Sequence, residues 1–395
     1  MQLSAEGLVV ACGDDSVEAA ISMRTELEPV SGPGQPVKPA VYEGGRYQID
    51  RRWRNSGDVA PTEVVVIDNV ASQANRLEAA LLKTRALTGL PELVLDLSSF
   101  DLPPHLPRVL SSWQFPHRHA DAYVRDALLG DEPFAKTALG KGLVDATAQN
   151  AAVLLAWFPQ SLLFGYWQSH LGKKRSQSKH ARAWVSEIVG WAPASTETRV
   201  LGLKGDALNL NTDETVTSNP DDRIEWEFGK AKVEGGKSDR LSEMGHGQVP
   251  FMREVDATMA GISFREVVQN STVSLAQLRR ISLGSDSGDA RDAAARALLV
   301  AMGLVAHSSA FGRGFALRSG ADLQPVQTTV TLVGSNEPDF VPLALDGALA
   351  LFAECKVIAE AAGVSLEGWD ADSVVLTPKP NLAKAIESTW LKLDD

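Results

Sequence analysis

Short runs of β-branched and apolar residues alternate with longer helical patterns along this chain, and this alternation constrains its fold more than any other feature. The run VVVID at residues 64–68 predicts a buried strand, because β-branched residues are enriched in such runs. Further strands are expected at 92–97, 161–167, 199–203, 328–333 and 373–378. Helices are expected at 69–88, 119–130, 142–157, 180–189, 289–306, 342–362 and 380–393. The pattern predicts a mixed α/β (α+β) protein but leaves the strand order open.

Length and composition narrow the class of protein further. The 395 residues suit roughly two or three ordinary domains, or one large domain with insertions. Apolar residues make up 44% of the chain and charged residues 22%, which excludes a wholly disordered protein. No apolar run reaches the ~18 residues that a membrane helix needs, and no secretory leader is expected. Two cysteines, Cys12 and Cys355, exclude a disulfide framework and a four-cysteine zinc site, so a reducing cytoplasm is expected.

The charge of the chain is unevenly distributed. The net charge of −12 argues against a surface that binds nucleic acid over its whole extent. Two segments are nevertheless basic and lie next to aromatic residues, which is typical of single-strand binding. Residues 170–182 carry Lys173, Lys174, Arg175, Lys179 and Arg182 without an acid, and residues 46–54 carry Arg46, Arg51, Arg52 and Arg54 around Asp50. Charge alone favours the simpler alternative of solvated basic loops.

The junction between the strand at 64–68 and the following helix groups polar side chains. At 100° per residue, an apolar stripe forms from Val70, Ala74, Leu77 and Leu81, and the opposite stripe holds Asn69, Ser72, Gln73 and Arg76. Free amides and the dipole of a helix N-terminus attract phosphate, and an arginine adds a bidentate donor. A phosphate-binding face is therefore one interpretation of this junction, but the residues alone favour an ordinary amphipathic helix with a wet face.

The tripeptide His117-Arg118-His119 raises the possibility of a metal centre. No other histidine stands at metal-ligand spacing, so the chance of a metal site is roughly one in ten. The sequence has no Walker A loop, HExxH, GxSxG or GxGxxG motif after a strand, so support for catalysis is weak. Two alternatives stay open: a metallohydrolase that uses His117 and His119, and a metal-dependent RNA-cleaving protein with Asp68, Asp121 or Asp206 as the loop acid.

Two further groups could contact a nucleic acid. Phe164, Tyr166 and Trp167 precede the basic segment, and the face that is not buried could stack on bases. Arg313 and Arg318 lie in a Gly- and Ser-rich segment after the Ala-rich helix and could contact a phosphate backbone. Packing and a helix-ending turn are the simpler explanations.

Several of these segments together resemble the backbone subunit of type I CRISPR surveillance complexes, in the RAMP superfamily, subtype I-G (formerly I-U). The resemblance lies in blocks that follow one another between residues 60 and 325. They are IDNVASQANRLEAAL at 67–81, PHRHADAYVRD at 116–126, SLLFGYWQSHLGKKRSQSKHARAWVSEIVG at 161–190, GQVPF at 247–251, SLAQLRRISLG at 274–284 and ALLVAMGLVAHSSAFGRGFALRSGADL at 297–323.

The resemblance implies a fold and a role. The fold would be one elaborated domain over residues 1–395, an RRM-like (ferredoxin-like) palm with a helical finger region. A loop-rich basic insertion at 29–60 and a polar, thumb-like excursion at 205–250 would interrupt it. The role would be a non-catalytic, Cascade-type subunit in antiviral defence, without a cofactor and away from membranes. Copies would form a head-to-tail helical filament along the crRNA, join other CRISPR effector subunits and present the guide to target DNA.

Overall fold

The computed structural model describes residues 3–43, 46–102, 104–169, 178–194, 208, 210–211, 213–219, 224–229, 237–246, 261–335 and 339–389. Its main element is a seven-stranded antiparallel sheet in the order β15-β16-β1-β14-β10-β3-β2. The strands are β1 (Ala20–Pro29), β2 (Ile49–Arg52), β3 (Thr62–Asp68), β10 (Trp184–Pro193), β14 (Phe264–Ser274), β15 (Phe315–Ala316) and β16 (Asp322–Val333).

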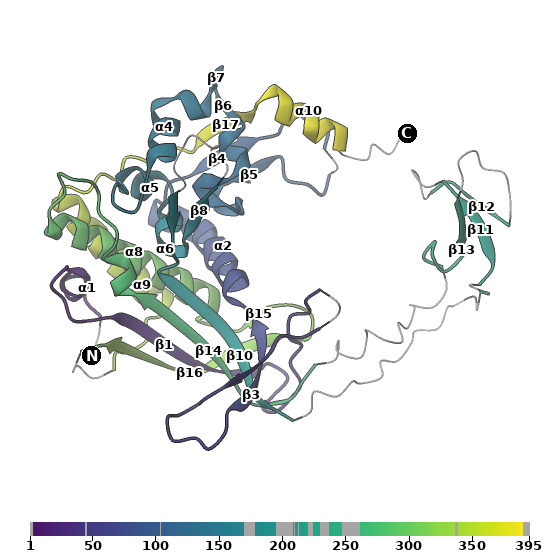
Figure 1. Ribbon diagram of the computed structural model, residues 1–395, viewed down its shortest axis with the longest axis horizontal. Helices are drawn as coiled ribbons and strands as arrows, with labels where there is room; N and C mark the ends of the chain where they lie inside the picture. Colours follow the sequence, from purple (N-terminus) through teal and green to yellow (C-terminus); the bar gives the residue numbers. More distant parts are fainter. Residues whose placement is uncertain are drawn as a thin grey trace.

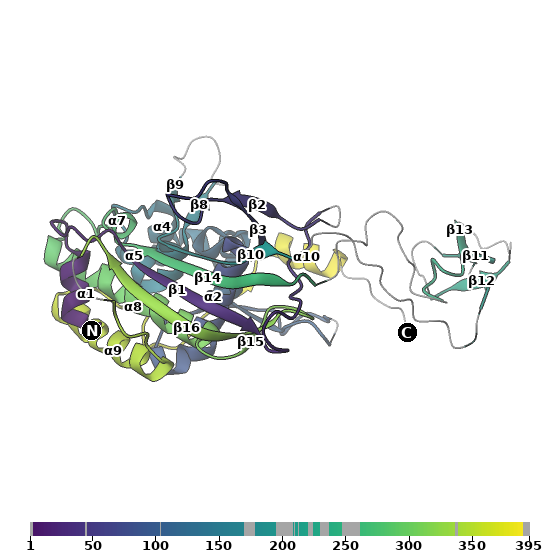
Figure 2. The ribbon, with the colours of Figure 1, turned by 90° about the horizontal axis from the view of Figure 1, so that it is seen from below.

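Two long helices cover one face of this sheet. They are α2 (Val70–Thr88) and α8 (Asp289–Phe311), and their apolar side chains share one core with the inward residues of β1 and β14. In Figure 2 the strands β16, β1 and β14 lie in front of these helices. Six elements of the sheet and these helices, β1, α2, β10, β14, α8 and β16, follow one another along the chain in a β-α-β-β-α-β order, with other elements between them. The mixed α/β prediction is confirmed.

A second, five-stranded sheet lies beyond the helices, at the top of Figure 1. Its strands are β5 (Val109–Ser111), β4 (Leu93–Asp96), β17 (Val374–Pro378), β6 (Ala127–Leu129) and β7 (Glu132–Pro133), in that order. The surrounding helices are α3 (Ala122–Arg125), α4 (Ala138–Asp145), α5 (Ala152–Trp157), α6 (Pro159–Phe164), α10 (Pro380–Thr389) and the 3-10 turns η1 (Ser112–Gln114), η2 (Arg118–Ala120) and η3 (Phe134–Lys136).

Two small sheets complete the description. The hairpin of β8 (Tyr166–Gln168) and β9 (Ser178–His180) flanks the segment 170–177, which lies outside the described residues. The strands β12 (Trp226–Phe228), β11 (Thr215–Ser218) and β13 (Lys237–Arg240) form an antiparallel sheet, which Figure 1 draws apart from the main body. This sheet falls within the excursion expected at 205–250, and its thumb-like role stays a prediction.

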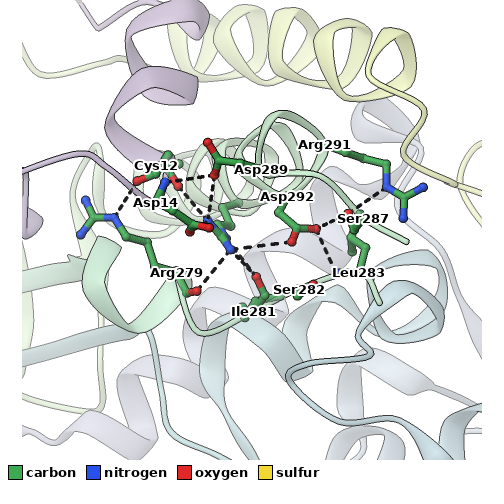
Figure 3. A network of polar contacts seen from close by, with 12 residues as sticks. Cys12, Asp14, Arg279, Ile281, Ser282, Leu283, Ser287, Asp289, Arg291 and Asp292 are labelled. Carbon is green, nitrogen blue, oxygen red and sulfur yellow. Dashed lines mark hydrogen bonds and ion pairs between the residues drawn. The ribbon is translucent and has the colours of Figure 1, made fainter. Parts of the chain in front are cut away.

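A buried arginine ties the N-terminal helix to the core. Arg296, on α8, is only 2% exposed, and its guanidinium donates to the carbonyl oxygens of Cys12 (3.1 Å) and Ile281 (2.7 Å) and to the Asp14 carboxylate (2.6 Å). Figure 3 shows these contacts converging from α1 (Ala5–Cys12), α8 and the segment after α7 (Leu275–Leu278). A buried charge with all its donors bound acts as a structural link between these elements.

Several local predictions were correct and others were wrong. Strands at 64–68, 92–97, 328–333 and 373–378 and helices at 69–88, 289–306 and 342–362 coincide with β3, β4, β16, β17, α2, α8 and α9 (Leu345–Ala361). The strand expected at 161–167 is a helix up to Phe164, followed by Gly165 at φ +81° and then β8. The helix expected at 180–189 is strand, because WVSEIVG lies in the middle of the large sheet. The helices expected at 119–130 and 142–157 are divided into shorter elements, and the strand expected at 199–203 lies outside the described residues.

One helix has the length and composition of a membrane span, although charged residues interrupt its apolar sequence. The helix Asp289–Phe311 is long and apolar enough by length and composition, but 83% of its most apolar stretch is buried inside the protein. A helix that is apolar on all sides and buried to this extent is typical of the central core of a protein.

Candidate nucleic-acid interface

The C-terminal end of β3 and the start of α2 meet at a fully buried carboxylate, Asp68. Its oxygens accept hydrogen bonds from Ser72 Oγ (2.9 Å) and Gln73 Nε2 (2.6 Å), both in the first turn of α2. They also accept from Arg76 Nε (3.0 Å) and from Arg318 (2.8 Å), which is 250 residues away in sequence. We call these residues the Asp68 cluster.

The Asp68 cluster holds two guanidinium groups in fixed positions at a partly open surface. The side chains of Arg76 and Arg318 are 28% and 24% exposed, whereas Asp68 is inaccessible. Further bonds run from Arg76 to the Leu317 carbonyl (3.1 Å) and from Arg318 to the carbonyls of Lys38 (3.1 Å) and Ile67 (2.9 Å). Two cations face one anion, so the cluster carries a net positive charge at a helix N-terminus.

The polar stripe of α2 is engaged in contacts within the protein, with Gln73 buried and Asn69, Ser72 and Arg76 partly exposed. Gln73 is fully buried, and its amide oxygen accepts hydrogen bonds from Ser186 on β10 (2.8 Å) and Gln269 on β14 (2.8 Å). Asn69 caps the helix by accepting from the Ser72 amide at 3.0 Å. The prediction that these residues bind phosphate therefore needs correction for Gln73, which has a structural role, whereas Arg76 keeps exposed surface.

Two tyrosines, Tyr42 and Tyr47, lie next to the Asp68 cluster. Burial raises the pKa of Tyr47 to about 12, although the nearby Arg318 opposes the shift. Burial also raises the pKa of Tyr42, against a hydrogen-bonding contribution from Asn69. Both phenols therefore stay neutral at physiological pH.

The predicted role of Arg118 as a nucleic-acid-binding residue needs correction. Its guanidinium donates to both oxygens of Glu78 on α2, at 2.7 and 2.9 Å, and to the Gly165 carbonyl at 2.9 Å. Arg118 is 8% exposed and Glu78 is 6% exposed. Because the guanidinium is buried and bound to a carboxylate, Arg118 is a structural residue and not an available phosphate ligand. Arg182, in contrast, is exposed, and partial burial followed by repulsion from Arg118 lowers its pKa.

The β8–β9 hairpin presents one aromatic ring and one cation to solvent. Trp167 is 59% exposed, and the ammonium of its cross-strand partner Lys179 lies 5.6 Å from the centre of its ring. Phe164 and Tyr166 are 1% and 7% exposed and pack in the core, so the predicted base-stacking role of these two is wrong. Trp167 alone among the predicted stacking residues is accessible, and with Lys179 it forms what we call the Trp167 platform.

Two of the four arginines at 46–54 form ion pairs on the large sheet. Arg52 pairs with Asp50 and with Glu187 on β10, and Arg54 pairs with Glu266 on β14. Hydrogen bonds to Glu187 raise the pKa of Arg52. Of the cations predicted there, Arg46 and Arg51 are exposed. RRM proteins stack bases on exposed aromatic residues of the sheet, whereas this face carries ion pairs.

Other predicted residues are scattered. Arg313 is exposed in the turn after α8, and His117 is exposed before η2. Lys173, Lys174 and Arg175 lie outside the described residues, so their predicted role stays a prediction.

The described residues hold no group of three or more His, Cys, Asp or Glu side chains that could bind a metal ion. His119 is buried against Ser161, with Nδ1 at 2.8 Å from Oγ, and is not paired with exposed His117. Burial lowers the pKa of His119 to about 3. Of the candidate loop acids, Asp68 is enclosed in its cluster, Asp121 caps α3 by accepting from the Tyr123 amide (3.0 Å), and Asp206 lies outside the described residues.

Sequence reasoning missed Asp68 as the centre of this arrangement. It named Asp68 only as a weak candidate acid, while it named Arg76 and Arg318 separately as cations. An acid that ends a fully buried strand, directly before a helix with polar residues in its first turn, was the available signal. The contact between Asp68 and Arg318 could not be predicted from the local sequence, because it joins distant parts of the chain.

Comparison with known proteins finds one family model that matches part of the chain. Residues 21–194 match the model of a family described as CRISPR-associated protein GSU0053 (Cas_GSU0053). No curated protein matches the sequence. Among solved structures, the crystal structure of Csc2 from Thermofilum pendens is matched over 94% of this chain and 75% of that chain, with 10% identity and a TM-score of 0.26.

The family match begins in β1 and ends one residue after β10. It therefore covers Asp68, Arg76 and the Trp167 platform, but not Arg318. Over residues 21–194, which include most of the candidate interface, the protein is similar to a CRISPR-associated protein family.

Proposed function

We propose that this protein is a crRNA-binding backbone subunit of a type I CRISPR effector complex of subtype I-G. It holds the guide by its phosphates and presents it for pairing with DNA. The observation that carries the proposal is the Asp68 cluster, in which one buried carboxylate orients two partly exposed arginines from distant segments. The match of residues 21–194 to a CRISPR-associated family supports it.

In this proposal the protein reads the backbone and base pairing reads the sequence. Phosphate contacts carry no base information, and a guide holder must accept any spacer sequence. Arg76, Arg318, Arg182 and Lys179 supply the phosphate contacts, and Trp167 supplies a sequence-tolerant stacking surface. The segment at 173–175 adds further cations. Several copies assemble head to tail on one RNA in the cytoplasm, together with other effector subunits.

The first test uses exposed cations whose removal leaves the fold intact. Binding of single-stranded RNA is measured as a function of salt for the wild type and for Lys179→Ala/Arg182→Ala. Each lost phosphate contact lowers the log–log salt slope by ~0.7, so the double variant should lower it by up to ~1.4, equally on unrelated sequences. The matched control is Lys83→Ala/Lys384→Ala, two exposed lysines on other surfaces. An unchanged slope in Lys179→Ala/Arg182→Ala would make the hairpin an ordinary solvated surface.

The second test addresses assembly and catalysis. Light scattering should show self-association of the protein only when a spacer-length RNA is present. The same preparations, incubated with Mg²⁺ or Mn²⁺, should leave both guide and target strands intact, since the candidate acids Asp68 and Asp121 are buried and bound within the chain. A monomer with and without RNA would contradict the filament, and a metal-dependent cut lost in Asp121→Ala would contradict the non-catalytic role.

A further inference from the structure

An exposed tryptophan lies where the edge strand β2 passes into the loop that leads to β3. Trp53 is 60% exposed, and with Arg54, Asn55, Ser56 and Asp58 it lines an open hollow of about 500 Å³. The residues assigned to RNA binding in the proposed function do not include Trp53. A large ring kept in water is unfavourable unless a partner covers it, so this ring is a candidate contact residue.

The two residues that flank Trp53 are anchored to the large sheet. Arg52 pairs with Glu187 on β10, and Arg54 pairs with Glu266 on β14. The backbone on either side of the ring is therefore fixed before any partner arrives. Binding to a group that is already in place loses less conformational entropy than binding to a mobile loop.

The other side of β2 carries accessible side chains that lead up to Trp53. Because successive residues of an extended strand point to opposite sides, Tyr47, Ile49, Arg51 and Trp53 share the side opposite the two anchored arginines. Ile49 is 49% exposed and Arg51 is exposed, whereas Tyr47 packs partly against the core. The Arg51 guanidinium forms no ion pair within the part of the chain that the structure describes, although Glu63 is its cross-strand neighbour on β3. We call Ile49, Arg51 and Trp53 the β2 stripe.

The β2 stripe continues the Asp68 cluster. Tyr47, which precedes the stripe, lies near Arg318 of the cluster, and Trp53 follows six residues later. At ~3.3 Å per residue the stripe therefore extends the candidate interface by roughly 20 Å. Three arginines face two carboxylates along this path: Arg51, Arg76 and Arg318 against Asp68 and Glu63. A path with a net positive charge that ends at an exposed ring fits a single-stranded nucleic acid, which offers phosphates to cations and bases to rings.

The hollow beside Trp53 suits a base better than a phosphate. Its only acid, Asp58, accepts hydrogen bonds from the backbone amides of Arg54 and Asn55, both at 2.9 Å. This carboxylate would repel a phosphate in the hollow but not an uncharged base. The phosphate of the same nucleotide would then lie toward Arg51, away from Asp58.

We propose that Trp53 stacks on one base of a bound single-stranded RNA, with Arg51 at the adjoining phosphate. The strand then runs from the Asp68 cluster along the β2 stripe to the tip of the β2–β3 hairpin. This assignment rests on the proposed function and adds to it a second stacking residue and a path for the strand. A stacking contact accepts every base, because every base has a π-face, so it suits a guide of any sequence.

The first experiment measures binding of a fluorescein-labelled single-stranded RNA to the full-length protein by anisotropy, at several salt concentrations. Trp53→Ala should weaken binding roughly 5- to 150-fold, the loss of one stacked base. It should leave the log–log salt slope unchanged, because a neutral ring releases no counterions, whereas Arg51→Ala should lower the slope by ~0.7. Trp53→Phe keeps a ring and should retain most of the affinity.

Matched controls come from exposed residues outside the β2 stripe. Val59→Ala changes a fully exposed apolar residue in the same loop and should leave RNA affinity unchanged. Lys83→Ala removes an exposed cation on α2 and should leave the salt slope unchanged. Circular dichroism checks that each variant is folded, which is expected because all the replaced side chains are exposed.

The second experiment tests for direct contact with an RNA that contains 5-iodouridine, which cross-links to aromatic side chains on irradiation. Cross-links located by mass spectrometry should include residue 53 in the wild type and in Val59→Ala, but not in Trp53→Ala. A cross-link at Trp167 in the same samples reports separately on the proposed function.

Three results would overturn the assignment. One is that Trp53→Ala binds RNA as tightly as Val59→Ala while Lys179→Ala/Arg182→Ala still lowers the salt slope, which would leave the proposed function standing. Another is that Trp53→Ala weakens RNA-dependent self-association although residue 53 never cross-links, which would make the ring a contact between protein copies. The third is a wild type that binds no single-stranded RNA, which would refute the proposed function and this assignment together.

Discussion

The ion pair between Arg118 and Glu78 gives the sharpest test of the structure against the sequence-based prediction. If Arg118 contacts phosphate, Arg118→Met should weaken RNA binding and leave stability nearly unchanged. If it neutralises a buried carboxylate, the substitution should destabilise the fold. Both side chains are at most 10% exposed, and two bonds of 2.7 and 2.9 Å join them. Removing one partner of such a buried pair costs about 3–5 kcal/mol, because the other charge is left unpaired.

The pH dependence of this loss has a definite sign. Burial raises the pKa of Glu78 above its ordinary value of 4.5, and Arg118 opposes that shift. Without Arg118 the pKa rises further, so the native state binds more protons than the unfolded state between 4.5 and the raised value. Stability then falls as pH increases through this window. The destabilisation by Arg118→Met should therefore be smaller at pH 5 than at pH 8.

Urea unfolding followed by tryptophan fluorescence measures these differences by linear extrapolation. The control is Arg125→Met, whose ion pair with Asp126 joins side chains that are 48% and 34% exposed, and it should cost less than about 1 kcal/mol. In Glu78→Gln/Arg118→Met no charge is left buried, so most of the lost stability should return. Unchanged stability of Arg118→Met, together with a loss of RNA affinity, would refute the buried-pair assignment.

Three further outcomes are expected. Arg296→Met should destabilise the protein by about 3–5 kcal/mol in the same urea assay. The substitution leaves the carbonyl oxygens of Cys12 and Ile281, and the buried Asp292 carboxylate that lies 3.9 Å from the guanidinium, without a cation. The control Arg291→Met should cost less than about 1 kcal/mol. Trp167→Ala should weaken RNA binding by about 1–3 kcal/mol in a filter-binding assay without lowering the melting temperature, since the ring is exposed. Burial raises the pKa of both thiols, Cys12 and Cys355, to about 12, so iodoacetamide should label neither until the protein is unfolded; labelling of the native protein would contradict their burial.

Local sequence patterns were enough to predict the elements whose residues agree with their surroundings. VVVID became β3, the helical pattern at 69–88 became α2, and the Ala-rich stretch from 289 became α8. In each of these elements a strong helix or strand propensity agrees with a hydrophobic pattern that matches the burial of its residues. The stretches 161–167 and 180–189 were assigned wrongly because short apolar runs fit helix or strand equally well, and their neighbours in space decide between them. The mixed α/β class followed from the sequence, whereas the order β15-β16-β1-β14-β10-β3-β2 did not.

The residues of the candidate interface also show what can be predicted from the sequence and what only the tertiary structure decides. The sequence predicted Arg76, Trp167, Lys179 and Arg318 as nucleic-acid-binding residues from side-chain chemistry alone, and the structure leaves each of them at least partly exposed. The accessibility of a side chain, in contrast, depends on its neighbours in space. Phe164 is buried in the core, and Arg118 is bound to Glu78. Only the tertiary structure brings Arg318 to Asp68 across 250 residues. A hydrogen bond between distant segments is set by how helices pack on a sheet, and local spacing along the chain carries no record of that packing.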